Sequence, residues 1–178
     1  MKRIVTGTEL ESLLEQAHMK SRLRRELRFV PGTIADWQDL EFVGISDRSG
    51  DKGVLLIEPH ERLFVVPYTL SRRIANRQTG RTKPIICDLC HTWQAGSNAG
   101  RVTFVRPADA HTITFLCCVD LDCCNHVRNK TQAALLSRVQ LHEDLTTDQR
   151  VERLKTRLQR LAGDLGLAPI ANDGEYGA

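Results

Sequence analysis

Six cysteines in closely spaced groups limit what this chain can fold into more than any other feature of its sequence. Cys87 and Cys90 have two residues between them, a spacing that lets one tight turn direct both sulfurs at a common point. A second group follows further along the chain and contains Cys117, Cys118, Cys123 and Cys124. Four thiolates around a tetrahedral ion at about 2.3 Å form a structural zinc site, which leaves no open position for a substrate. The pattern therefore predicts a zinc-stabilised binding module before it predicts an enzyme.

The spacing alone does not decide which cysteines of the second group bind the metal. Cys117 and Cys118 are adjacent in a predicted strand, so their side chains point to opposite faces. Cys123 and Cys124 are adjacent at a predicted helix start, where neighbouring side chains diverge by about 100°. One member of each couple can therefore reach a shared ion. His126 is an alternative fourth ligand, and ordinary buried thiols are the alternative for the whole set.

The composition and the first residues favour a cytoplasmic protein. Hydrophobic residues make up 41% of the chain and charged residues 26%, which is ordinary for a soluble globular protein. No apolar run approaches the roughly 20 residues that cross a bilayer, and residues 1–7 lack the apolar stretch of a secretory signal. Because cytoplasmic thiols stay reduced, the paired cysteines predict metal ligands rather than disulfides.

Hydrophobic patterning predicts an α+β domain with an antiparallel sheet. An amphipathic helix is expected to begin at Thr8, with Glu11 at capping-box spacing, and to extend into the low twenties or on to Leu27. Residues 72–83 are expected to form a polar loop, or a short helix and a loop. The other predicted elements are strands over 40–45, 54–57 and 63–68, a hairpin of 102–105 with 112–116, and helices within 120–130 and over 147–162.

The order of these elements around the cysteines is that of a treble-clef zinc finger. A cysteine-bearing turn comes first, a strand hairpin follows, and a second ligand pair lies at a helix start, all within 87–130. The resulting division is an N-terminal helical segment over 1–30, an α+β domain over 31–165 that contains this finger, and a flexible tail over 166–178. Helices thus flank the sheet at both ends of the chain.

Specific motifs surround both cysteine groups. The first group reads Cys-Asp-Leu-Cys, and the second reads Cys-x-Asp-Leu-x-Cys from Cys118 to Cys123, followed by Val127-Arg128. Upstream, the segment from Trp37 to Gly44 reads Trp-x-x-Leu-x-Phe-x-Gly. These motifs resemble the C-terminal domain of the FBP family, the elongation factor G-binding proteins that include the fusidic-acid-resistance proteins. The resemblance spans roughly residues 8 to 160 and is most specific between Cys87 and Arg128.

The resemblance implies both a ligand set and a function. It selects Cys118 and Cys123 as partners of Cys87 and Cys90 around Zn²⁺, and it leaves Cys117 and Cys124 as packing thiols. It implies a non-enzymatic translation factor that binds elongation factor G and helps to release it from a ribosome stalled by fusidic acid. The resistance proteins place a helical bundle before the zinc domain. With one helix predicted there, this chain resembles a short form that is essentially the zinc domain.

Two other functions compete with this interpretation. The net charge is only +3, but basic residues cluster, and a direct RNA or ribosome binder would use such a basic surface. A redox-responsive zinc switch would use the spare Cys117 and Cys124. Catalysis by the adjacent Cys90 and His91 is disfavoured, because neighbours on a turn seldom align for proton transfer. The candidate contacts for a protein or RNA partner are Arg72, Arg73, Arg77, Arg128 and Lys130, and Trp93 is either a packing residue or a recognition residue.

Overall fold

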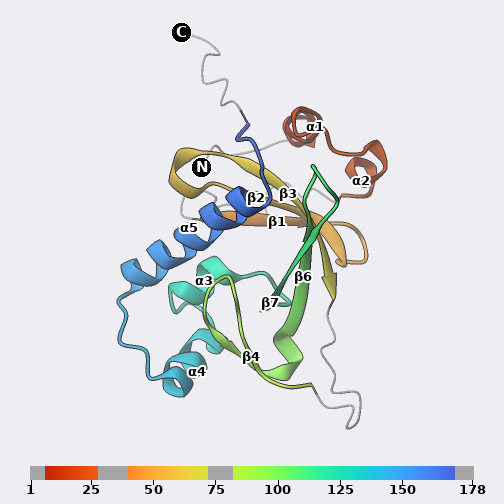
Figure 1. The fold of residues 1–178 in the computed structure, drawn as a ribbon. Coiled ribbons are helices and arrows are strands. Elements are labelled where there is room, and N and C mark those ends of the chain that lie inside the picture. The colour runs from red at the N-terminus through yellow and green to blue at the C-terminus, as the bar shows by residue number, and fades with distance from the viewer. Residues whose placement is uncertain (1–6, 28–39, 72–81, 171–178) are drawn as a thin grey trace.

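The computed structural model describes residues 7–27, 40–71 and 82–170, and the fold is stated for these residues. They form an α+β structure in which helices flank an antiparallel sheet (Figure 1), as the sequence predicts. No helix within these ranges is long and apolar enough to cross a membrane. The elements are α1 (Gly7–Gln16), α2 (Ser21–Glu26), β1 (Phe42–Ser46), β2 (Lys52–Ile57), η2 (Pro59–Glu61), β3 (Phe64–Ser71), β4 (Ile85–Ile86), β5 (Trp93–Gln94), η3 (Gly96–Asn98), β6 (Ala99–Val105), β7 (Thr112–Cys118), α3 (Cys123–Val127), α4 (Gln132–Leu141) and α5 (Thr147–Asp164).

The main sheet has the strand order β1-β2-β3-β6-β7, and every neighbouring pair is antiparallel. The predicted meander and the predicted hairpin are both confirmed. Asp47 shapes the turn between β1 and β2, since its carboxylate accepts hydrogen bonds from the backbone N–H of Gly50 at 2.8 Å and the hydroxyl of Ser49 at 2.9 Å. Gly50 adopts a positive φ of 74°, which costs glycine no steric energy. The short pair β4–β5 lies between β3 and β6 in the chain.

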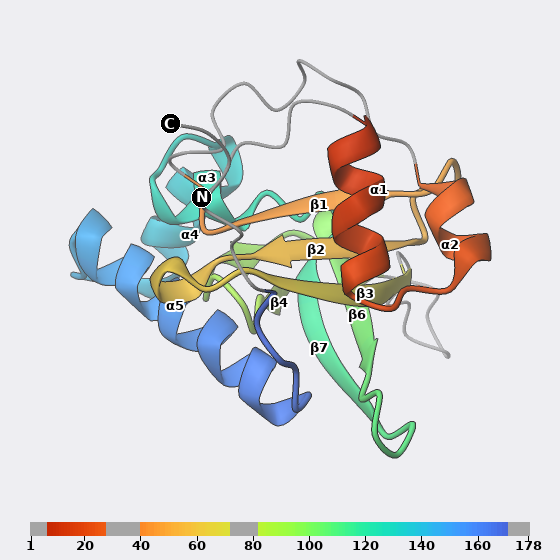
Figure 2. The same cartoon turned by 90° about the horizontal axis from the view of Figure 1, so that it is seen from above.

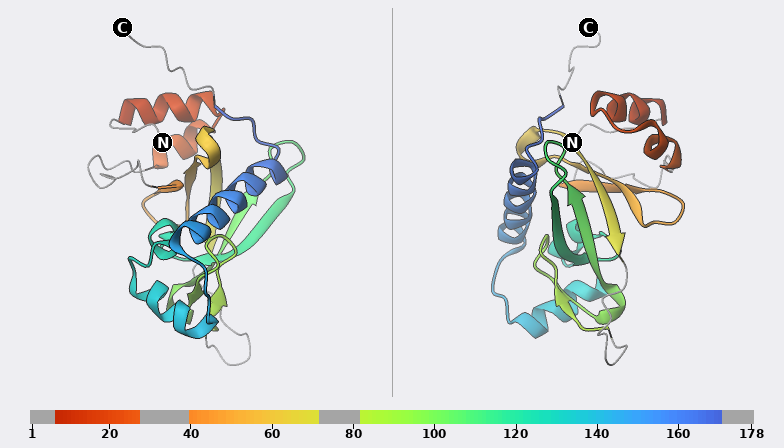
Figure 3. Two further views of the ribbon diagram at one scale, coloured as in Figure 1. Left: turned by 90° about the vertical axis from the view of Figure 1, so that its left-hand side faces the viewer. Right: turned by 45° about the vertical axis from the view of Figure 1, so that its right-hand side comes forward.

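Strand alternation divides the described apolar residues between two clusters on opposite faces of the sheet. On β2, Leu55 and Ile57 belong to one cluster, whereas Val54 and Leu56 belong to the other, as the period of two along a strand requires. The first cluster includes α5 and all six cysteines, and the second includes Leu10 and Leu14 of α1. Figures 2 and 3 show the same arrangement, with α1 and α2 on one side of the sheet and α5 on the other.

The predicted single N-terminal helix is wrong, because the chain breaks it into α1 and α2. Helix α1 ends at Gln16, and His18 then takes a left-handed conformation with φ 52°. The turn lets Ala17 and Met19 remain against the second cluster and redirects the chain, so that Leu27 forms a β-bridge with Asp47. Pro31 and Gly32, the predicted end of the helix, lie outside the described residues.

The C-terminal helix follows the prediction closely. Thr146 and Gln149 form a complete capping box before α5, and Leu154, Leu158 and Leu161 form its buried stripe. The chain beyond α5 pairs again with the sheet through a bridge between Ile170 and Leu63, with a hydrogen bond of 2.8 Å from the N–H of Ile170. The division into 1–30, 31–165 and 166–178 stays a prediction.

Gly53 in β2 is expected to tolerate no side chain. A Cβ added there would lie 2.7 Å from the Tyr68 hydroxyl oxygen and still closer to the carbonyl oxygen of Ile45 on β1. Gly53→Ala should therefore force the strands apart and cost about 2–3 kcal/mol of unfolding free energy, measured by urea denaturation. Gly44→Ala on β1 is the matched control, since its Cβ would meet nothing closer than 3.5 Å. Equal stability of the two variants would contradict this account of β2.

Candidate metal centre

The first cysteine pair lies in a tight turn between β4 and β5. The backbone N–H of His91 donates to the carbonyl of Cys87 at 2.8 Å, and the N–H of Cys87 donates to the carbonyl of Thr92 at 3.0 Å. His91 takes a left-handed conformation with φ 56°, which lets the chain reverse directly after Cys90. Both cysteine side chains of the turn are buried.

Asp88 fixes this turn against β7. Its backbone N–H donates to the carbonyl of Leu116 at 2.8 Å, and its carboxylate accepts from the N–H of Leu116 at 2.7 Å. Leu116 is followed closely on β7 by Cys118, so this double contact sets the first pair in register with the second. Cys123 is the first residue of α3, and a turn with Leu121 at φ 53° joins it to β7. Nothing in the sequence predicted the role of Asp88.

The four sulfurs of Cys87, Cys90, Cys118 and Cys123 converge, and their mutual spacing fits a tetrahedral metal ion. The Sγ atoms of Cys90 and Cys118 lie 3.6 Å apart, those of Cys87 and Cys123 lie 3.9 Å apart, and those of Cys118 and Cys123 lie 4.0 Å apart. All four lie within 4.8 Å of one another. A tetrahedron with metal–sulfur bonds of about 2.3 Å has edges of about 3.8 Å. The donor set therefore has the size that a zinc ion requires.

Metal ligation explains this cluster better than disulfide bonding. All six cysteines are free, and the sulfur separations greatly exceed the roughly 2.05 Å of an S–S bond. Burial by itself would raise the pKa of Cys90, but hydrogen bonds from the thiols of Cys118 and Cys123 outweigh it and hold that pKa well below the usual value. The hydrogen bond with Cys118 contributes most to raising the pKa of Cys123. Because neighbouring thiols oppose each other's ionisation, four thiolates can coexist here only around a cation.

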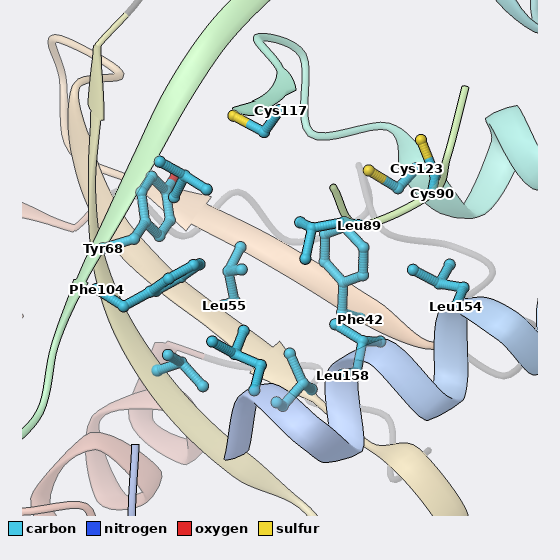
Figure 4. Packing of buried hydrophobic residues seen from close by; sticks show 14 of the residues in the cluster. Phe42, Leu55, Tyr68, Leu89, Cys90, Phe104, Cys117, Cys123, Leu154 and Leu158 are labelled. Carbon is cyan, nitrogen blue, oxygen red and sulfur yellow. The ribbon is translucent and has the colours of Figure 1, made fainter. Parts of the chain in front are cut away.

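Cys117 and Cys124 point away from the cluster. Figure 4 shows Cys117 apart from Cys90 and Cys123, and the Sγ atom of Cys124 faces the carbonyl oxygen of Phe42 at 3.6 Å. Burial and the nearby charges of Cys87 and Cys90 raise the pKa of Cys117, and burial with the charge of Glu41 raises that of Cys124 to about 12. The geometry thus separates the cysteines that spacing alone left undecided.

The cluster forms part of the main hydrophobic core. Leu89, between the two cysteines of the first pair, is buried with Phe42 of β1 and Leu154 of α5 in the same cluster of apolar residues as the sulfurs (Figure 4). A bound ion would therefore connect the finger directly to the sheet and to α5. Loss of the ion is expected to destabilise parts of the structure beyond residues 87–130.

His126 lies beside the cluster instead of replacing a cysteine in it. The side chain is buried, with 2% of its surface exposed, and a ring nitrogen groups with the Cys118 sulfur and an Asp120 carboxylate oxygen, all within 4.8 Å of one another. Four cysteine sulfurs already supply all the ligand positions around a tetrahedral ion. The sequence pattern indicated His126 only as an alternative ligand, because it lies one helical turn after Cys123.

The predicted partner contacts are placed only in part. Arg72, Arg73 and Arg77 lie outside the described residues. Arg128 binds internally: its Nη1 and Nη2 donate to the two carboxylate oxygens of Glu41 at 2.8 and 2.6 Å, and Nη1 also donates to the carbonyl of Cys124 at 2.9 Å. Lys130 is exposed.

Two further residues near the centre are Trp93, which the sequence left undecided, and Glu41, which it did not indicate. Trp93 is half-buried on β5, and its backbone N–H donates to the Ser137 hydroxyl of α4 at 2.8 Å. Sequence reasoning missed Glu41, whose buried carboxylate before β1 has no counterpart in a hydrophobic pattern.

Comparison with known protein families agrees with this geometry. A family model described as the FBP C-terminal treble-clef zinc-finger matches residues 21–165, which is most of the chain. The chain belongs to this family. No curated protein and no solved structure matched it. The match confirms the resemblance seen in the motifs. It also covers all four converging cysteines, so the candidate metal centre lies within the FBP zinc-finger domain of this chain.

Proposed function

We propose that this chain is a zinc-stabilised, non-enzymatic binding protein of the translation machinery and that its partner is elongation factor G. The observation that carries the metal part is the convergence of four buried sulfurs at tetrahedral spacing. A donor set made only of thiolates suits zinc, and it supplies all four positions of the ion. A zinc ion held by Cys87, Cys90, Cys118 and Cys123 would stabilise the fold and take no part in a reaction.

The protein partner is supported by the family and by one exposed surface. The resemblance of its motifs to the FBP family implies that the chain binds elongation factor G. Helix α4, next to β5 of the finger, exposes Leu135, Leu136 and Val139, with exposed fractions of 50%, 47% and 68%. Single exposed apolar residues are common, but a group on one short helix is typical of a binding surface. We call these three residues the α4 apolar surface.

Binding is tested with the purified, zinc-loaded chain and purified elongation factor G. The two are expected to co-elute in size-exclusion chromatography at about physiological ionic strength, where screening suppresses weak surface attraction. Leu136→Ser and Val139→Ser on the α4 apolar surface should each weaken the complex about 10-fold or more, as truncation of a central interface residue does. Failure of the wild-type protein to co-elute would refute the partner and leave the metal centre standing.

Val105→Ser is the matched control for these variants. Val105 is exposed to a similar degree, 46%, but it lies on β6 near the tip of the β6–β7 hairpin, at the opposite end of the molecule from α4 (Figure 1). The substitution should leave binding unchanged. Equal loss of binding from Val105→Ser and Val139→Ser would show that α4 is not the contact surface.

The competing functions make different predictions in the same assay. A direct RNA binder would retain ribosomal RNA with an affinity that falls steeply with salt, because phosphate contacts release counterions. Internal binding of Arg128 by Glu41 removes one of the basic residues proposed for that role.

A redox switch through Cys117 and Cys124 finds less support. Both thiols are buried and both have a raised pKa, which keeps them in the unreactive protonated form. We place the protein in the cytoplasm, because a reducing compartment keeps thiols available to a metal.

A further inference from the structure

A chain of hydrogen-bonded side chains connects the turn before α3 to the side of the sulfur cluster. Asn98 of η3 contacts Asp120, Gln94 of β5 contacts Asn98, and His126 of α3 contacts Gln94. Gln94 has none of its surface exposed and His126 has 2%, so the inner end of this network is shielded from water. Buried polar groups of this kind stabilise a single arrangement only when each donor meets an acceptor.

The direction of every hydrogen bond follows from one backbone group. The N–H of Asp120 can only donate, so the Asn98 oxygen that it meets at 3.3 Å is Oδ1. The Asn98 amide nitrogen must then donate, and it does so to the Asp120 carboxylate at 2.9 Å and to Gln94 Oε1 at 2.8 Å. This leaves the Gln94 amide nitrogen facing His126 Nδ1 at 3.5 Å. His126 Nδ1 is therefore an acceptor, and the ring proton is on Nε2.

The ring proton is in position to serve the sulfur cluster. A ring nitrogen of His126 lies within 4.8 Å of the Cys118 sulfur. Because Nδ1 accepts from Gln94, the N–H at Nε2 is the donor that the ring can offer to sulfur. The partly exposed Asp120 carboxylate lies 3.7 Å from Nε2.

We propose that His126 is a positioning residue of the metal centre. The network of Asp120, Asn98 and Gln94 holds its ring in the Nε2–H tautomer, and that N–H donates to a thiolate of the cluster. The hydrogen bond disperses negative charge on the four sulfurs and holds their side chains in place, as outer-shell partners of metal ligands do. The inference deepens the zinc centre proposed above and rests on it.

The test measures zinc affinity and the spectrum of the cobalt-substituted protein. Zinc competition against a chromophoric chelator should show that His126→Leu weakens binding about 10- to 100-fold, the usual cost of an outer-shell substitution. The sulfur-to-cobalt charge-transfer band should move to longer wavelength, because a thiolate without its hydrogen bond gives up electron density more readily. A purely structural role for His126 would leave this band in place.

Three further variants keep the result interpretable. Gln94→Met retains the His126 ring but frees its tautomer, so it should shift the cobalt band in the same direction by a smaller amount, even if His126→Leu fails to fold. His126→Gln retains an amide donor and should restore the wild-type band. Val127→Ala is the control for packing loss, since Val127 is a buried neighbour on the same helix, and it should leave band and affinity unchanged.

The outcomes separate this inference from the metal centre itself. Wild-type cobalt and zinc binding with identical bands in His126→Leu, Gln94→Met and Val127→Ala would overturn the role of His126 and leave the centre intact. A wild-type protein that binds neither metal would overturn both.

Discussion

Replacing Cys87 or Cys123 with alanine is expected to abolish stoichiometric metal binding and the cooperative unfolding transition of the protein. Structural zinc contributes an apparent binding free energy of about 10–16 kcal/mol, whereas whole domains are stable by only about 5–15 kcal/mol. The sulfurs also lie inside the main hydrophobic cluster, so the loss should extend to the sheet and α5. Metal analysis and thermal unfolding followed by circular dichroism measure the two effects.

Cys117→Ala and Cys124→Ala are the matched controls for these variants. Both thiols are as buried as the ligands, so each substitution removes a comparable volume from the same cluster, but neither removes a metal ligand. Each should retain one metal ion per chain and lose only about 1–2 kcal/mol of unfolding free energy. Loss of metal from either control, together with retention in Cys118→Ala or Cys123→Ala, would show that the ligand set is wrong.

Glu41→Gln is expected to destabilise the protein by about 3 kcal/mol, because it leaves the Arg128 guanidinium without its countercharge in a largely water-excluded position. The side chains of Glu41 and Arg128 expose only 4% and 17% of their surface, and two hydrogen bonds join them. The pair joins the residue before β1 to the end of α3, so it couples the sheet to the finger. For a chain of this size the loss should lower Tm by about 6–12 °C.

An exposed ion pair provides the comparison for this prediction. Arg22 and Glu26 on α2 expose 86% and 41% of their side chains, so Glu26→Gln should change the unfolding free energy by less than about 1 kcal/mol. The double variant Glu41→Gln/Arg128→Met should recover part of the loss, since no unpaired charge remains. If Glu41→Gln costs no more than Glu26→Gln, the buried pair does not couple the two parts of the fold.

The parts of the structure that sequence reasoning predicted correctly are those with a strong local signal. The short apolar runs of β1 to β3 and the apolar stripe of α5 at helical spacing can be recognised without tertiary information. The cysteine spacing predicted the finger, and the motif between Cys118 and Arg128 identified the family. The spacing could not decide which of two adjacent cysteines binds the metal, because that choice depends on which face of β7 meets the turn that carries Cys87 and Cys90.

Helix α4 was not predicted, and its side chains explain why. Its buried positions are occupied by the small Ala134 and Ser137, whereas Leu135, Leu136 and Val139 are exposed. A search for an apolar stripe facing the core therefore finds no helix here. The break at His18 was missed for a related reason, because the left-handed turn there is imposed by packing on the sheet rather than by glycine or proline.

Polar contacts between distant segments were also beyond the sequence. Arg128 was predicted to face a partner, but a carboxylate 87 positions earlier binds it inside the protein. The hydrogen-bonded chain from Asp120 to His126 likewise joins residues from separate turns and strands. Such pairings depend on the folded topology, and no local pattern of residue types encodes them.

Metal content combined with chelator sensitivity tests the central claim most directly. Protein purified under reducing conditions without added metal should contain one zinc ion per chain, and removal of that ion by a strong chelator should unfold it, with recovery on return of zinc. A preparation that contains no stoichiometric metal and unfolds at the same temperature with and without the chelator would contradict the account.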